Sequence, residues 1–82
     1  MEEYTIVQVS AKIYWGFNIK ISNNKLPLMS EIEIVEEIKD SMRKFFKKYN
    51  LEELKEGVNE LNLHIHVPIV LGKTIYVCDH GS

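Results

Sequence analysis

The chain has 82 residues and a mass of 9.6 kDa, which leaves room for one small domain and excludes most folds that bind large cofactors. Hydrophobic residues make up 45% of the sequence and charged residues 27%, a balance typical of a folded globule and not of a disordered segment. Ten Lys and Arg oppose twelve Asp and Glu, so the net charge of −2 excludes a global positive field that would attract nucleic acid.

The cysteine content and the N-terminal residues bear on the cellular compartment. Cys78 is the one cysteine and cannot form an internal disulfide, which favours a reducing compartment. The start, Met1-Glu2-Glu3, is acidic where a secretory signal is basic, and no apolar run approaches the roughly 18 residues of a membrane-spanning helix. We therefore expect a cytoplasmic protein that does not bind membranes.

The first predicted element is a β-hairpin. From Thr5 to Ile21 apolar residues recur at odd positions and polar residues at even positions, which is the period of a strand. At about 3.3 Å per residue one straight strand of this length would outreach a small domain, so the chain must fold back. Gly16 is the residue that suits a turn. A three-residue loop, Tyr14 to Gly16, would pair Val9 with Ile21 and place Gly16 at the left-handed third position.

One long helix and a short one are predicted next. Ser30 and Glu33 have the spacing of a capping box, so the long helix should begin at Glu31. Asn50 suits the left-handed residue that ends it. A second short helical segment is predicted from Leu51 to Glu56. The long helix has one apolar stripe at three- and four-residue spacing: Ile34, Val35, Ile38, Met42, Phe45, Phe46 and Tyr49.

The C-terminal part alternates again and predicts a second hairpin, with strands in 61–70 and 74–79. The two hairpins and the long helix together predict a ββαββ domain over residues 1–82. Its fold class is α+β, with a four-stranded antiparallel or mixed sheet and one helix packed on one face. One helix cannot cover both faces, so the opposite sheet face should remain uncovered.

Turn length decides which polar side chains of the second hairpin share a face. A three-residue turn would pair His66 with Cys78 and His64 with His80, and all four would point to the same side. A two-residue turn would instead bring Asp79 beside His66. We favour the first register, because it collects the apolar residues of both strands on one face.

The four polar side chains that share a face in the favoured register can be interpreted in two ways. In the first, they belong to an exposed polar sheet face that binds no metal and no cofactor. The alternative is a small metal-dependent protein that uses His64, His66, Cys78 and His80, since zinc takes nitrogen and sulfur ligands.

The sequence lacks the motifs of common enzymes. It has no Gly-rich phosphate loop, no nucleophile elbow and no Cys-x-x-Cys pair. Cys78 has no clear activating base, and the carboxylate pairs lie on the solvated helix face. The sequence therefore favours a protein that is not an enzyme.

Protein binding is the predicted function. Tyr, His and Ile are frequent at interfaces, and a contiguous uncovered patch normally indicates a partner, either another protein or a second copy of the chain. A sheet edge is a further route for the same function. Small acidic chains without catalytic motifs are typical of phage and mobile-element products that inhibit a host machine, including anti-CRISPR proteins. The predicted partner-binding residues are Tyr4, Lys12, Tyr14, Lys20, His64, His66 and Tyr76.

Single-stranded nucleic-acid binding is a second hypothesis. Tyr4, Tyr14 and Tyr76 would stack on bases, and Lys12 and Lys20 would contact phosphates. The acidic net charge argues against this function.

Overall fold

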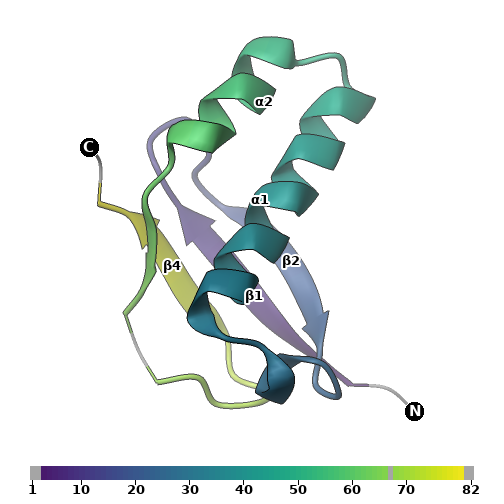
Figure 1. Cartoon of the computed structure of the whole chain (residues 1–82), viewed down its shortest axis with the longest axis vertical. Coiled ribbons are helices and arrows are strands. Elements are labelled where there is room, and N and C mark those ends of the chain that lie inside the picture. Colours follow the sequence, from purple (N-terminus) through teal and green to yellow (C-terminus); the bar gives the residue numbers. More distant parts are fainter. Residues whose placement is uncertain (1–2, 67, 81–82) are drawn as a thin grey trace.

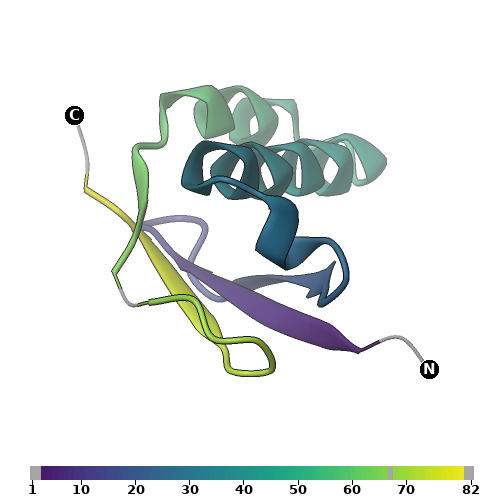
Figure 2. The same cartoon turned by 60° about the horizontal axis from the view of Figure 1, so that its bottom comes forward.

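A computed structural model describes residues 3–66 and 68–80 and shows two layers, a four-stranded sheet and a layer of helices over one of its faces (Figures 1 and 2). The predicted α+β fold class is therefore confirmed. Met1, Glu2 and Val67, which belong to the sequence-based expectations, lie outside the described residues. The elements in chain order are β1 (Tyr4–Ser10), β2 (Phe17–Ser22), η1 (Leu26–Leu28), α1 (Glu31–Lys48), α2 (Glu52–Gly57), η2 (Val58–Glu60), β3 (Leu63–Ile65) and β4 (Ile75–Asp79).

The sheet is mixed, with the strand order β2-β1-β4-β3. β1 is antiparallel to β2 and parallel to β4, and β3 is antiparallel to β4. The first and last strands of the chain therefore lie side by side at the centre of the sheet (Figure 1). β2 and the short β3 form its edges.

The register of the first hairpin differs from the prediction. Val9 lies opposite Phe17, not opposite Ile21, because the chain between β1 and β2 is a six-residue loop, 11–16, in place of three residues. Gly16 closes this loop in the predicted left-handed conformation, with φ +80°, and its N–H donates to the carbonyl of Val9 at 2.9 Å. The shift is an even number of residues, so each side chain keeps its predicted face.

The second hairpin is shifted in the same way. His64, not His66, lies opposite Cys78, and a long connection replaces the predicted three-residue turn. A buried hydroxyl holds this connection, since the Oγ1 of Thr5 accepts the N–H of Gly72 at 2.9 Å. The shift is again an even number of residues. The predicted face of each side chain is therefore right, although the predicted residue pairs are wrong.

The ends of α1 are as predicted. The hydroxyl of Ser30 accepts the N–H of Glu33 at 3.2 Å, and the carboxylate of Glu33 accepts the N–H of Ser30 at 3.1 Å. Asn50, two residues after Lys48, has the predicted left-handed conformation with φ +58°. α2 follows and lies beside α1 in the helical layer (Figure 1).

The core lies between the odd-numbered side of the sheet and α1. It contains inward side chains of both central strands and part of the predicted apolar stripe of the helix, whereas Phe45 and Tyr49 of that stripe are exposed. The most deeply buried members, each at most 1% exposed, are Val7, Val9, Ile75, Val77, Ile34, Ile38 and Met42. Across the described ranges, no helix lies over the opposite sheet face (Figure 2). Nor does any helix of residues 3–66 or 68–80 combine the length and apolar character that a membrane span requires.

Candidate functional site

The outer sheet face is the surface formed by the outward side chains of the four strands. It includes no carboxylate, and Lys20 is its one lysine or arginine. The acidic residues of the described elements lie mainly in the helical layer. The members of the outer sheet face are Tyr4, Ile6, Gln8, Ser10, Asn18, Lys20, Ser22, His64, Tyr76 and Cys78.

Three large side chains are exposed along the two central strands of this face. Tyr4 is 50% exposed, Ile6 42% and Tyr76 56%. Gln8 pairs with Tyr76 across the parallel β1–β4 contact, so Tyr76 lies diagonal to Ile6 on the neighbouring strand. The face therefore has a central apolar and aromatic area with polar side chains around it.

The predicted partner-binding residues divide into two groups. Tyr4, Lys20, His64 and Tyr76 lie on the outer sheet face as predicted. His66 follows the end of β3 and is exposed next to them.

Tyr14 and Lys12 do not lie on the outer sheet face, and their predicted placement there is wrong. Tyr14 is only 6% exposed: its ring packs 5.5 Å from that of Phe46, and its hydroxyl donates to the carbonyl of Leu54 at 2.8 Å. The alternation of faces holds only for extended chain, and β1 ends at Ser10 before both residues. Because Lys12 and Tyr14 lie outside the strand, their even sequence numbers do not predict which face of the sheet their side chains lie on.

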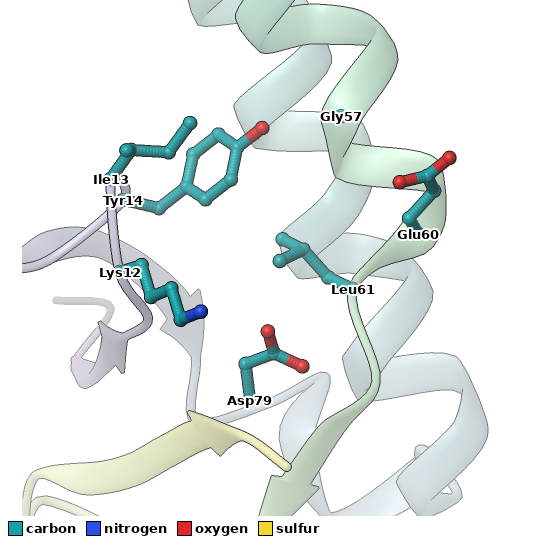
Figure 3. A pocket seen from close by; sticks show the side chains of 7 residues that line it. All are labelled: Lys12, Ile13, Tyr14, Gly57, Glu60, Leu61 and Asp79. Atoms are coloured by element: carbon teal, nitrogen blue, oxygen red, sulfur yellow. The ribbon is translucent and has the colours of Figure 1, made fainter. Parts of the chain in front are cut away.

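An open hollow of about 420 Å³ lies at this end of the sheet, between the 11–16 loop and the helical layer. Lys12 and Asp79 both project toward it (Figure 3). Asp79 also accepts the backbone N–H of Asn62 at 2.9 Å. The lining residues include no Ser, Cys or His. They are Lys12, Ile13, Tyr14, Gly57, Glu60, Leu61 and Asp79.

One residue that lines the hollow has a shifted pKa. Burial raises the pKa of the Tyr14 phenol above its ordinary value, and the nearby carboxylate of Glu60 raises this pKa further. Both effects favour the neutral phenol, which is the form that donates to Leu54.

A second constellation, the His/Cys cluster, is formed by His66, Cys78 and His80 beside the outer sheet face. The Nε2 of His66 contacts the Sγ of Cys78, and the Nε2 atoms of His66 and His80 are 3.0 Å apart. The two imidazole rings stack at 4.8 Å. One possible ligand atom from each of the three residues lies within 4.8 Å of the others.

His64 belongs to the predicted four-residue metal set but lies beside the cluster. Its Nε2 is 3.1 Å from the Oδ1 of Asn62, and its ring is 4.5 Å from that of His80. The structure therefore brings three of the four predicted ligands together. Their common parity made the grouping visible in the sequence, whereas the exact contacts depend on the shifted register.

Two residues that line the hollow were not identified from the sequence. Gly57 and Glu60 line the hollow, and they come from a helical segment whose approach to the 11–16 loop is a long-range contact. No local pattern indicates such a contact.

Comparison with known proteins does not assign this site. The chain matches no protein-family model, no curated protein and no solved structure.

Proposed function

We propose that this chain is a non-enzymatic protein-binding module that acts through the outer sheet face. The observation that carries this proposal is the exposure of Tyr4, Ile6 and Tyr76 together on a face over which no helix of the described chain lies. Large exposed side chains in one contiguous area are typical of interaction surfaces.

The chemistry around these three residues suits a protein partner. The other outward positions carry mainly Ser, Asn and Gln, which form adaptable hydrogen bonds. Tyrosine adds a large and rigid contact area at a low entropy cost. Charged residues are depleted in the cores of interfaces, and the central strands carry none on this side.

The partner that we propose is another protein with a neutral or mildly acidic surface. Lys20 gives one side of the face a positive charge, and the outward side chains of the four strands include no carboxylate. The size and composition of the chain suit an inhibitor that covers part of a host protein, as phage and anti-CRISPR products do. A second copy of the chain would instead give a dimer of the isolated protein.

The face is favoured over the edges of the sheet. β3 contributes only three residues to one edge, and β2 carries Lys20 in the middle of the other. Short edge strands and edge lysines are common means by which proteins prevent the addition of another strand.

The nucleic-acid hypothesis loses support. Tyr14 is buried, so two of the three proposed stacking residues remain on the face. Lys12 lines the hollow, which leaves Lys20 for phosphates on the outer sheet face. Since each phosphate contact contributes a separate part of the salt-dependent affinity, one lysine supports only weak binding.

Affinity capture from the native host tests the proposal. The bait proteins are the unchanged chain, an Ile6→Thr/Tyr76→Thr variant of the outer sheet face, and an Ile32→Ala/Tyr49→Ala control. The control removes the same residue types from exposed positions at α1, and each variant keeps residue types that suit its element.

We expect one host protein in stoichiometric amount with the unchanged chain and the control, and its loss with the outer-face variant. Binding of that purified protein should have the same pattern. Equal capture by both variants would overturn the proposal. A dimer of the isolated chain that the outer-face variant disrupts, or oligonucleotide binding at low salt that it removes, would assign the face to those partners instead.

A further inference from the structure

We propose that His66, Cys78 and His80 form a zinc-binding site with three protein ligands and one open coordination position. This proposal does not rest on protein binding through the outer sheet face, and it can be tested with the purified chain alone. The ligand atoms would be the Nε2 of His66, the Sγ of Cys78 and the Nε2 of His80.

The separations between these atoms suit a tetrahedral ion. With Zn–N distances of about 2.0–2.1 Å and a Zn–S distance of about 2.3 Å, ligand atoms of a tetrahedral site lie about 3.3–3.6 Å apart. The Nε2 atoms of the two imidazoles are 3.0 Å apart, and one donor atom of each of the three residues lies within 4.8 Å of the others. Side-chain shifts of about 1 Å are therefore enough to place the three atoms around one ion.

The backbone explains why these residues meet. Cys78 is held in β4 by pairing with both neighbouring strands. His80 follows β4, and its N–H donates to the carbonyl of Asn62 at 3.0 Å. His66 follows directly after Ile65, the last residue of β3, so its side chain reaches Cys78 diagonally across the strand pair. Three separate positions of the same sheet corner thus supply the ligands.

The donor set selects the class of metal. One thiolate and two imidazoles are typical ligands of zinc and related transition metals, whereas magnesium and calcium prefer oxygen ligands. The cluster contains no carboxylate. His66 and His80 are exposed and Cys78 is half-buried, so water can reach a fourth position on the solvent side.

His64 provides a matched control within the same corner. It lies opposite Cys78 and its ring is 4.5 Å from that of His80, but its Nε2 is directed to Asn62. Removal of His64 therefore takes away an imidazole next to the site without removing one of its proposed ligands.

Titration with Co²⁺, followed by displacement with Zn²⁺, tests the site in the purified chain under a non-chelating reductant. We expect one Co²⁺ per chain, a thiolate-to-cobalt charge-transfer band, and the visible bands of a tetrahedral cobalt complex. Zn²⁺ should remove these bands and raise the melting temperature, because an ion that binds only the folded state stabilises it.

The variants decide which residues are ligands. Cys78→Ser should abolish the charge-transfer band. His66→Ala and His80→Ala should each weaken binding by more than about 100-fold, since even groups outside the ligand shell contribute about 10- to 100-fold. His64→Ala should retain the band and change the affinity by less than about 10-fold, because the Nε2 of His64 is directed to Asn62 and not to a proposed ligand.

Two results would overturn the site. The first is the absence of a charge-transfer band in the unchanged chain while its melting curve shows that it is folded. The second is equal affinity of the unchanged chain and a His66→Ala/Cys78→Ser/His80→Ala variant, which would show that any metal binds elsewhere. Melting curves without metal verify that each variant folds.

Discussion

The hydroxyl oxygen of Tyr14 occupies the space that a side chain on Gly57 would need. A Cβ atom on Gly57 would collide with this oxygen and lie 3.6 Å from the Cζ of the same ring. The hydroxyl is held there because it donates to the carbonyl of Leu54 at 2.8 Å. This relationship joins the 11–16 loop to α2, two segments more than 35 residues apart.

Gly57→Ala should destabilise the protein although the substitution improves helix propensity. Gly57 has helical angles, φ −62° and ψ −23°, so Ala alone would be expected to stabilise by about 1 kcal/mol. The collision with Tyr14 should outweigh this gain and give a net loss of about 1–3 kcal/mol. The free energy of unfolding in urea measures the effect.

In the Tyr14→Phe variant, Gly57→Ala should no longer destabilise the protein. Removal of the hydroxyl should cost about 1 kcal/mol by itself, since one hydrogen bond is lost. Gly57→Ala in this background should be neutral or stabilise by up to about 1 kcal/mol, because the oxygen that collides is absent. An equal cost of Gly57→Ala in both backgrounds would show that the two residues are not coupled.

Tyr14 should also make stability depend on alkaline pH. Its pKa is raised in the folded state, mainly by burial, so its contribution to stability is complete below the unfolded pKa of about 10. That contribution is lost as the pH rises through the folded pKa, because the unfolded chain then releases the proton more easily. Between about pH 9 and 11 the free energy of unfolding should decline less steeply for Tyr14→Phe than for the unchanged chain. An equal decline in both proteins would show that Tyr14 does not cause this pH dependence.

The capping box of α1 should contribute measurably to stability. Ser30→Ala removes the hydroxyl that accepts the N–H of Glu33, and we expect a loss of about 1 kcal/mol. Ser41→Ala, in the middle of the same helix, should be neutral or slightly stabilising because Ala has the higher helix propensity. Equal effects of the two substitutions on the urea midpoint would argue against the cap.

The faces of the sheet could be predicted from sequence, whereas the strand pairs could not. Burial alternates with a period of two along β1 and β2, and both register errors were even shifts that keep each side chain on its face. The lengths of the connections depend instead on long-range contacts. Insertion of Tyr14 against Leu54 and the bond from Gly72 to Thr5 set those lengths, and no local pattern encodes either.

The candidate sites, too, could be predicted only where they depend on which face of a strand a residue lies. The parity of the second hairpin placed His64 and Cys78 on one side of the sheet, where the structure has them. The parallel pairing of β1 with β4 brings Ile6 and Tyr76 to adjacent strands, and it requires strand order, which a sequence pattern does not contain. Tyr14 was misplaced because its loop leaves the extended conformation before that residue.

The most direct test of protein binding through the outer sheet face is the methyl spectrum of the isoleucine-labelled chain, recorded as the captured host protein is added. Ile6 lies on the outer sheet face, and Ile32 is exposed on α1 in the opposite layer. We predict that the Ile6 methyl signals shift or broaden in proportion to the bound fraction while those of Ile32 keep their positions. Perturbation of Ile32 with unchanged Ile6 would contradict the account.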